Sequence, residues 1–471
     1  MVAFDDFWFM RIRLQARPLI SLTLLAFMAS GIFAQPIQTW RLGSDVDTPA
    51  SPLGGMVLSG GAGEVDPAMQ WFLQRANGGD VLVLRVSGSD GYQNYLYNEL
   101  GVDVASVETI RFAAPSAANA DYVVQRIAEA EAVWLAGGDQ NDYVNFWQGT
   151  PVEDGLHALV ARGGAIGGIS AGMAVLGGGY FAAGNGTVYS SQALANPYDT
   201  DVDVRYGDFL NLPHLSGIIT DTHFDDPDRR GRLLTFLARL VTDHGVSVPR
   251  AIACNEYAVV AIQPNGLAKV WGEWPDYEEY AYFVRPDCTS PSLGAGPVPE
   301  VCTDGEPLSW GISPDDNGDA DGHGGLLAAK VPAGYDGAIS FDLNTWLPTE
   351  NVEWERWTAD GDGQFHSGPL PAQEAPEANP ECGLDLTAIH PLAHRPSDGP
   401  QLELRLTPSN HWMVHSYHPS PILGRLYSAQ GQVSDNLTLS PGSQPLELPA
   451  HARGPLLLWT EAGILRIPAS R

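Results

Sequence analysis

Short apolar strands alternate with stretches of helical periodicity from about residue 54 to residue 262, and this pattern restricts the fold more than any other feature. The predicted strands are Met56–Leu58, Val81–Leu84, Val104–Phe112 and Ala132–Leu135, and the predicted helices start at Pro67 or cover Tyr92–Leu100 and Ala118–Ala130. Strands that are apolar on both faces are typical of a parallel sheet that helices cover on both sides. The sequence therefore predicts an α/β fold whose ligand site lies at the carboxyl ends of the strands.

The glycine-rich segment from Gly163 to Ala174 carries the strongest chemical signal. It fits the nucleophile-elbow pattern G-x-S-x-G, with Ser170 as the candidate nucleophile. A sharp turn from strand to helix strains the backbone at the serine, so its neighbours must be small. The helix that follows directs its first amides toward an oxyanion, which makes the N–H of Ala171 a candidate donor. The alternative is a glycine-rich turn that only lets a strand and a helix pack closely.

His223 is the candidate base. It follows the apolar strand at residues 218–221, and a histidine at a strand end can reach a nucleophile on a neighbouring strand. The alternative is a structural histidine beside the aromatic ring of Phe224.

A second strand runs into a tight glycine turn at Leu135–Gln140. Glycines let the backbone approach a reacting carbonyl closely, so the N–H of Gly138 is a candidate second oxyanion donor. The alternative is an ordinary turn in which Asp139 caps the following helix.

The formal charge of −31 at pH 7 argues against two classes of partner. A field of this sign repels nucleic acid and anionic membrane surfaces. We interpret the acidity as a solubility feature outside the cell or in a salty habitat, with attraction of a cationic substrate as the alternative. A chain of 471 residues with 44% hydrophobic content is long enough for a substantial core and two or more domains.

Residues 1–34 are predicted to be a signal peptide. Arg11, Arg13 and Arg17 precede an apolar run, Leu19–Ala34, which is short for a membrane span and ends in small residues. A retained membrane anchor is the alternative. Because no later segment approaches about 18 uninterrupted apolar residues, we expect a mature protein without a membrane span, secreted or at the cell surface.

The remaining polar motifs predict neither a metal nor a cofactor. Export permits disulfides, and Cys288 and Cys302 could close a local loop, although the pairing of the four cysteines is left open. The Asp315–Gly322 segment is rich in carboxylates, but Ala328 stands where a calcium loop needs a bidentate glutamate, so an acidic loop is favoured over a calcium site. The turn Gly60–Gly63 lacks the spacing of a dinucleotide-binding fingerprint.

Four motifs together resemble the cyanophycinase and aspartyl-dipeptidase family of serine peptidases. They are Ala-Gly-Gly-Asp-Gln ending at Gln140, Gly-x-Ser-Ala-Gly around Ser170, Asp-Thr-His-Phe around His223, and the arginines Arg229 and Arg232. They occur in the order that the family shows, and the resemblance covers residues 54–262. It implies the flavodoxin-like fold of class I glutamine amidotransferases, in which a parallel sheet lies between helix layers.

The same resemblance implies the roles of the site residues. Ser170 is the implied nucleophile and His223 the implied base, and no metal is needed. The residues implied for substrate binding are Asp139, Gln140, Asp221, Arg229 and Arg232. The two arginines would bind a substrate carboxylate, with a solvated helix face as the alternative. The implied substrates are β-aspartyl peptides or short acidic dipeptides.

The acid of the triad is left open between three residues. Glu256, the first choice, matches an acidic strand-end position in such proteins. In the dipeptidase branch the acid lies between serine and histidine, where this chain has Gln192, which could orient an imidazole but could not stabilise its positive charge. Asp199 is a further candidate. Pro227 stands where a cyanophycin-degrading enzyme is expected to have another arginine, which argues against the polymer as substrate.

The character of the chain changes after about residue 285, where proline, glycine and aspartate increase and short alternating runs such as Ala338–Phe341 and Leu402–Leu406 replace helical periodicity. The predicted organisation is a signal peptide at 1–34, a catalytic α/β domain at 35–285, a β-rich accessory region at 286–405 and a small β-sandwich at 406–471. The segments that resemble a type IX secretion sorting domain are Tyr417–Pro421, Leu426–Gln432 and Gly454–Trp459. An ordinary β-rich accessory domain is the alternative.

The sequence thus predicts an exported serine peptidase with a peptide substrate and an export machinery as partners, and it leaves a homodimer open. One alternative is a catalytically decayed binding protein on the same scaffold, suggested by Gln192 and the missing arginine. A glutamine amidotransferase-like activity is disfavoured because serine stands in place of cysteine at position 170.

Overall fold

The computed structural model describes residues 36–287, 298–311, 325–370 and 376, together with seven strands between residues 402 and 467. The chain forms two compact units, Met1–Leu386 and Thr387–Arg471. The sequence features that lie outside the described residues are the segment 1–34, Asp315–Gly322, Tyr417–Pro421, Cys288 and Cys382, together with residues 429–432 and 454–455 of the other two sorting-domain segments. In the described ranges, no helix has the length and apolar character needed to cross a membrane.

The first sheet has ten strands and a parallel centre. In spatial order they are β1 (Ile37–Gly43), β4 (Ser106–Phe112), β3 (Asp80–Arg85), β5 (Ala132–Leu135), β6 (Ala165–Ile169), β2 (Gly55–Ser59), β11 (Val259–Ile262), β12 (Leu267–Trp274), β16 (Ser340–Asp342) and β17 (Leu347–Pro348). The strands from β4 to β2 run parallel, whereas the strands at both edges are antiparallel to their neighbours. The predicted α/β fold with a parallel sheet is confirmed.

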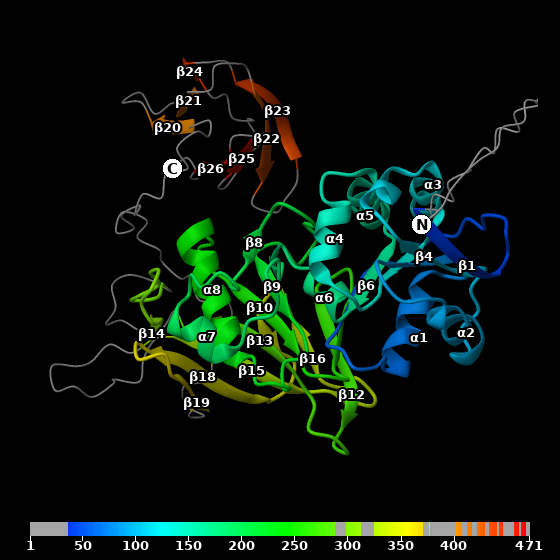
Figure 1. Ribbon diagram of the computed structural model, residues 1–471, viewed down its shortest axis with the longest axis horizontal. Coiled ribbons are helices and arrows are strands. Elements are labelled where there is room, and N and C mark those ends of the chain that lie inside the picture. Colours follow the sequence, from blue (N-terminus) through cyan, green and yellow to red (C-terminus); the bar gives the residue numbers. More distant parts are fainter. Residues whose placement is uncertain are drawn as a thin grey trace, which may run out of the picture. The chain divides into compact units, whose positions relative to one another are not determined.

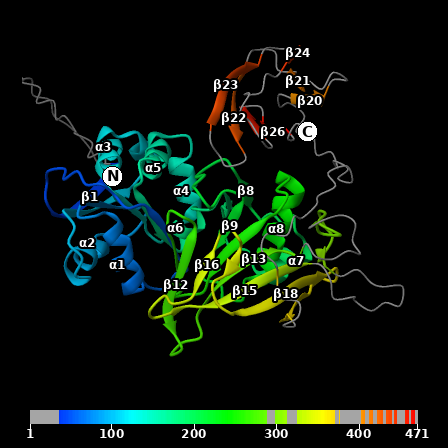
Figure 2. The ribbon, with the colours of Figure 1, turned by 180° about the vertical axis from the view of Figure 1, so that it is seen from behind.

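A second sheet of nine strands lies beside the first (Figure 1). Along its main path it contains β14 (Ser309–Trp310), β18 (Glu353–Asp360), β15 (Leu326–Pro332), β13 (Tyr280–Pro286), β10 (Arg250–Cys254), β9 (Ile218–Asp221), β7 (Gly179–Phe181) and β8 (Val204–Tyr206), and β19 (Phe365–Pro369) pairs with β18. Strands that the sequence analysis assigned to an accessory region therefore extend both sheets, since β15 pairs with β13 and β16 pairs with β12 (Figure 2).

The helices cover the sheets in layers. They are α1 (Asp66–Arg75), α2 (Gly91–Asn94), α3 (Asp121–Glu129), α4 (Gln140–Trp147), α5 (Pro151–Ala161), α6 (Ala171–Ala174), α7 (Ser190–Ala195) and α8 (Arg230–His244), with a π-helical turn η1 (Tyr95–Glu99) and a 3-10 turn η2 (Pro115–Asn119). Buried side chains of α1 and η1 pack on one face of the first sheet, and those of α3, α4 and α5 pack on the other. Helix α8 packs on the second sheet.

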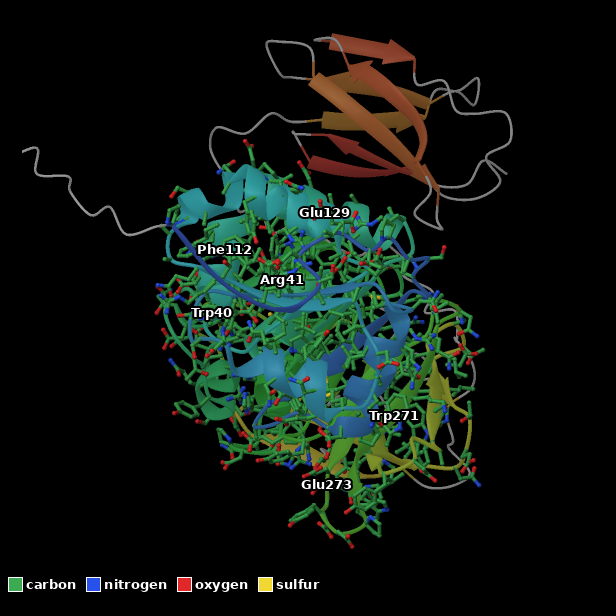
Figure 3. All side chains as sticks on the ribbon, turned by 90° about the vertical axis from the view of Figure 1, so that its right-hand side faces the viewer. Trp40, Arg41, Phe112, Glu129, Trp271 and Glu273 are labelled. Atoms are coloured by element: carbon green, nitrogen blue, oxygen red, sulfur yellow. The ribbon has the colours of Figure 1, made fainter. Side chains whose placement is uncertain are left out.

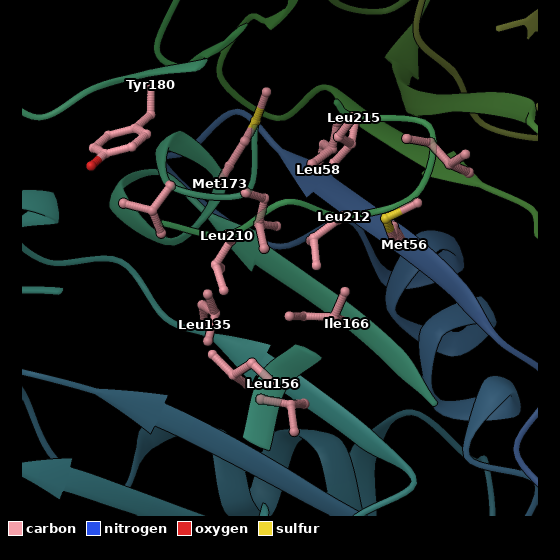
Figure 4. Close-up of a cluster of buried hydrophobic side chains, with 14 of the residues drawn as sticks. Met56, Leu58, Leu135, Leu156, Ile166, Met173, Tyr180, Leu210, Leu212 and Leu215 are labelled. Carbon is pink, nitrogen blue, oxygen red and sulfur yellow. The ribbon is translucent and has the colours of Figure 1, made fainter. Parts of the chain in front are cut away.

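Alternating strand residues feed two cores on opposite faces of the first sheet. Met56 and Leu58 of β2 enter the core shared with the second sheet, whereas Val57 enters the core under α1. Figure 4 shows part of the shared core, which includes Met56 and Leu58 of β2, Ile166 of β6 and Leu156 of α5. One apolar cluster thus packs both against helices and between the two sheets.

The local signals for helix ends act as expected at several positions. Asp139 caps α4, and its side chain accepts a hydrogen bond from the Asn141 N–H at 2.9 Å. A proline opens α5 directly after Thr150, and α8 ends at Gly245, whose φ of 63° is readily adopted by glycine.

Two predicted helices differ from the structure. The stretch Ala118–Ala130 is not one helix, because Ala120 is extended (φ −74°, ψ 125°) and separates η2 from α3. The stretch Tyr92–Leu100 is divided between α2 and the wider turn η1. Periodicity located the helical segments but not the breaks within them.

The C-terminal unit contains two antiparallel sheets. The first consists of β20 (Leu402–Leu406), β21 (Trp412–Ser416) and β24 (Gly442–Pro445), and the second of β23 (Val433–Leu439), β22 (Ile422–Ser428), β25 (Leu456–Thr460) and β26 (Gly463–Ile467).

A buried charge network joins β1 to the parallel strands. Glu108 of β4 accepts hydrogen bonds from Arg41 at 2.7 Å and from Arg126 at 2.9 Å, and it also binds the Tyr122 hydroxyl. Its side chain is only 1% exposed. Figure 3 shows Arg41 and Glu129 on the same face of the molecule. Glu129 pairs with Arg126 nearer the surface.

Replacing Glu108 by glutamine should destabilise this unit by about 2 kcal/mol, because two partly buried guanidinium groups lose the buried carboxylate that they share and keep only Asp80 and Glu129 as partners. The matched control is Glu129→Gln, which removes a more exposed partner of Arg126 and should cost less than about 1 kcal/mol. Urea unfolding of both variants measures the difference. An equal loss of stability in the two variants would contradict a structural role for the buried network.

Candidate active site

Ser170 lies on a strained turn between β6 and α6. Its backbone has φ 54° and ψ −118°, a conformation that residues other than glycine rarely adopt. The glycines on either side leave no room for a side chain: a Cβ on Gly172 would lie 2.0 Å from the Leu135 carbonyl oxygen, and one on Gly168 would lie 2.5 Å from the Gly172 backbone. The glycines therefore allow the strand and the helix to pack closely, as the alternative interpretation required. The strained backbone of Ser170 is present in addition, as a nucleophile elbow requires.

His223 reaches Ser170 from the second sheet. The Ser170 Oγ and the His223 Nε2 are 2.8 Å apart, which is a hydrogen bond. The prediction that the histidine and the serine lie on neighbouring strands is wrong, because β9 pairs with β10 and β7 and not with β6. The short helix α6 carries the chain from the first sheet toward the second, so the two residues meet where the sheets adjoin.

Glu256 completes a chain of hydrogen bonds. Its Oε1 lies 2.6 Å from the Nδ1 of His223, and it is positioned on the connection from β10 to β11, which links the second sheet to the first. The side chains of His223 and Glu256 are 25% and 32% exposed, so a ligand can approach them.

The other two candidates for the acid contact each other and not the histidine. The amide nitrogen of Gln192 donates hydrogen bonds to Asp199 at 3.0 Å and to Asp201 at 2.8 Å. The structure therefore brings Glu256, rather than Gln192 or Asp199, to the imidazole.

Backbone hydrogen bonds tie the turns of the site together. The Ser170 N–H donates to the Ser59 carbonyl and the His223 N–H to the Gly60 carbonyl, both at 3.0 Å. The Tyr257 N–H donates to the Gly61 carbonyl at 3.1 Å. The turn after β2 is thus bonded to the nucleophile, the base and the residue beside the acid.

The glycines of this turn make room for the imidazole, a role that the sequence analysis did not identify. A Cβ on Gly61, whose φ is 137°, would lie 2.3 Å from the His223 ring, and one on Gly63 would lie 2.8 Å from the Tyr257 ring. The only signal in the sequence was a glycine-rich turn at the carboxyl end of a strand.

The two candidate oxyanion donors lie on turns that border Ser170. Ala171 is the first residue of α6, so its N–H has no acceptor within the helix. The turn Gly137–Gly138 adjoins the serine, since a Cβ on Gly137 would lie 3.7 Å from the Ser170 Cβ. Within the described residues, the Gly138 N–H has no hydrogen-bond acceptor and the residue is exposed. Both amides thus border Ser170, and that of the exposed Gly138 is open to a ligand oxygen, whereas Ala171 is only 3% exposed.

Asp139 and Gln140 follow this turn at the start of α4. The Asp139 carboxylate accepts the Asn141 N–H, so it serves the helix as its N-cap. Gln140 is half-buried at the first position of the helix. Of this pair, Asp139 is used as the helix cap, whereas the Gln140 side chain forms no hydrogen bond within the described residues.

Asp221 and Arg232 bind each other. The Arg232 Nε donates to one carboxylate oxygen of Asp221 at 3.0 Å and an Nη binds the other, while the two side chains are only 4% and 3% exposed. The arginine also lies over the ring of Phe181. This geometry favours a structural role for the pair over the predicted contact with substrate.

Arg229 is placed differently. Its Nη1 donates to the Thr222 carbonyl at 2.8 Å, directly before His223, and its Nε is buried without a hydrogen-bond partner. In the described part of the chain it forms no ion pair with a carboxylate. Burial and the neighbouring Arg232 lower its pKa. A half-buried cation beside the base is therefore open to an anionic ligand.

Burial shifts the pKa of two further groups near the acid. It raises the pKa of the Cys254 thiol, which is completely buried and unpaired, so this sulfur is not a competing nucleophile. It also raises the pKa of Glu279 to about 7, and the charges of Glu273 and Asp225 add to this shift. In the described residues, no group of three or more His, Cys, Asp or Glu side chains could hold a metal ion.

Comparison with known families identifies the segment that carries these residues. Residues 85–242 match the model of peptidase family S51, and this match supports a serine-type hydrolase. The match includes Ser170 and His223, whereas Glu256 lies beyond its end. None of the curated proteins matches the sequence.

Two solved structures are similar to part of the chain. A peptidase from an acI-B1 Actinobacterium has 14% sequence identity and a TM-score of 0.35, covering 47% of this chain and 89% of its own. A putative peptidase E protein from Listeria monocytogenes EGD-e has 14% identity and a TM-score of 0.32, covering 46% of this chain and 98% of its own.

Replacing Gly61 by alanine should displace the imidazole and lower the reactivity of Ser170 by about a hundredfold, since the added carbon would overlap the His223 ring. The rate of covalent labelling by a fluorophosphonate probe measures this reactivity. The matched control is Gly78→Ala, where φ is also positive (84°) but no atom lies within 4 Å of the added carbon. That variant should lose about 1 kcal/mol of stability at unchanged reactivity, and wild-type reactivity in Gly61→Ala would contradict the prediction.

Proposed function

We propose that the chain is an exported serine peptidase that hydrolyses aspartyl, and in particular β-aspartyl, peptides through Ser170, His223 and Glu256. The observation that carries the proposal is the continuous hydrogen-bond chain from Ser170 Oγ through the imidazole to Glu256 Oε1, with distances of 2.8 and 2.6 Å. The match to peptidase family S51 supports the reaction class, and the family resemblance supports the choice of peptide.

In the first step Ser170 Oγ attacks the carbonyl carbon of the scissile bond while His223 Nε2 takes the hydroxyl proton. The carbonyl oxygen becomes an oxyanion, which the N–H groups of Ala171 and Gly138 hold. Glu256 accepts a hydrogen bond from His223 Nδ1–H and stabilises the positive imidazolium.

The tetrahedral intermediate then breaks the carbon–nitrogen bond. The imidazolium donates its proton to the leaving amine, and an ester remains on Ser170. Water, deprotonated by the same imidazole, hydrolyses this ester and regenerates the serine. The strained backbone of Ser170 helps to hold Oγ at the exposed end of the sheet, where the carbonyl can approach.

Arg229 provides the substrate's carboxylate with a counter-charge. Its guanidinium lies beside the His223 turn and binds no carboxylate of the described chain, whereas the charge of Arg232 is already taken by Asp221. One arginine thus suffices for a short peptide with a free carboxylate. Pro227 in place of a further arginine is a reason to prefer such a peptide over cyanophycin.

Export is proposed from the sequence. The basic and apolar character of residues 1–34 supports a signal peptide, and motifs within 406–471 support a sorting domain. The described geometry also removes one motive for the decayed-enzyme alternative, because Gln192 does not occupy the position of the acid.

Ser170→Ala should abolish probe labelling and lower the hydrolysis of a β-aspartyl dipeptide by a factor on the order of 10⁴, because the nucleophile is lost. Glu256→Gln should lower kcat by a factor on the order of 10² to 10³, since the amide cannot stabilise the imidazolium. Asp199→Asn serves as the matched control and should retain wild-type kcat. Loss of activity in Asp199→Asn with retention in Glu256→Gln would refute the assignment of the acid.

Arg229→Met should raise KM for the dipeptide by about tenfold or more with a smaller effect on kcat, because a charge-assisted contact to the ground state is lost. Dipeptide analogues with one carboxylate converted to an amide provide the control. If the amide replaces the carboxylate that Arg229 binds, the KM of the wild type should rise. The KM values of the wild type and of Arg229→Met should then be about equal. If the wild type keeps a lower KM than Arg229→Met for every analogue, Arg229 does not bind a substrate carboxylate.

A further inference from the structure

Asp225 connects the turn that carries the base to the turn that carries the acid. It lies two residues after His223, and its Oδ1 accepts a hydrogen bond from the backbone N–H of Glu256 at 2.9 Å. We infer that Asp225 is a positioning residue, which holds the backbone of Glu256 where its carboxylate meets the His223 Nδ1. The inference rests on the proposed function.

The other bonds between these turns differ in kind. The Phe224 N–H donates to the Cys254 carbonyl at 3.2 Å, which is a link between backbone atoms. Apart from the bond between His223 and Glu256 themselves, Asp225 supplies the side-chain hydrogen bond that joins the two turns in the described structure. A substitution can therefore remove this link without changing the backbone of either turn.

The turn of the acid needs such support for two reasons. Tyr257, the next residue, has a φ of 57°, and a non-glycine residue keeps this conformation only when its surroundings impose it. The Glu256 side chain is also 32% exposed and has three rotatable bonds, so packing alone does not fix its carboxylate at 2.6 Å from the imidazole. An anchored backbone N–H limits the positions that the carboxylate can reach.

The charge of Asp225 acts on its neighbours and has to be separated from the hydrogen bond. Burial raises the pKa of Glu279, and the charge of Asp225 contributes to this shift. Burial lowers the pKa of Arg229, which the charge of Asp225 partly offsets. Asparagine removes the charge but keeps an oxygen that can accept the Glu256 N–H, whereas alanine removes both.

The test compares Asp225→Ala, Asp225→Asn and the matched control Asp226→Ala, which removes an exposed carboxylate from the neighbouring position. We expect Asp225→Ala to lower both the fluorophosphonate labelling rate and kcat by about tenfold, with KM changed less than about twofold. Asp225→Asn should restore most of the rate, and Asp226→Ala should behave as the wild type. An equal loss in alanine and asparagine variants, or wild-type rates in Asp225→Ala, would overturn the inference.

A double-mutant cycle separates positioning from a general loss of structure. If Asp225 acts through Glu256, then Asp225→Ala should have almost no further effect on kcat in a chain that already carries Glu256→Gln. Multiplicative losses in the double variant, or a lower melting temperature that accounts for the slower rate, would refute the role.

The same experiment distinguishes this inference from the proposed function. A wild-type chain that the probe does not label, or labels as strongly in Ser170→Ala, would show that the proposed hydrolase is wrong. Normal Ser170-dependent labelling that is unaffected by Asp225→Ala would refute only the role of Asp225.

Discussion

The hydrogen bond from the His223 N–H to the Gly60 carbonyl joins the second sheet to the first, and the geometry of the site depends on this junction. The nucleophile belongs to one sheet and the base to the other, so neither sheet alone could set their separation. Small residues are required at the junction because the imidazole lies directly against Gly61. The glycines of this turn thus serve the site, although they supply no catalytic group.

The two arginines near the site differ in whether a buried carboxylate of the protein neutralises their charge. Asp221 and Arg232 are removed from solvent together, where each satisfies the other, and this pair anchors α8 to β9. Arg229, only three residues earlier, is half-buried and has no such carboxylate partner in the described chain. Arg232 of α8 is therefore used by the fold, whereas Arg229, directly before the helix, is the candidate for binding a ligand.

Local signals in the sequence were sufficient to predict the parallel sheet, and they pointed to Ser170 and His223 as candidates, since such signals mark strands, elbows and strand ends. They left the acid open between Glu256, Gln192 and Asp199, because only the fold shows which of these side chains reaches the imidazole. The sequence could not show that β9 belongs to another sheet, because strand pairing depends on contacts between residues far apart in the chain. It could not show the pairing of Asp221 with Arg232 either, because each residue taken alone was an equally good candidate for binding the substrate. Only the approach of α8 to β9 distinguishes a partner inside the protein from a partner in the substrate.

The late strands of both sheets have a consequence for how the protein is made. A growing chain that ends just after Glu256 already contains the serine, the histidine and the acid. As synthesis continues, β12 and β13 are made before β15 and β16, which pair with them. Until β15 and β16 follow, β12 and β13 would each present an open sheet edge. Synthesis must continue to these strands before the edges are covered, and a polypeptide terminated earlier would be exposed to aggregation at those edges.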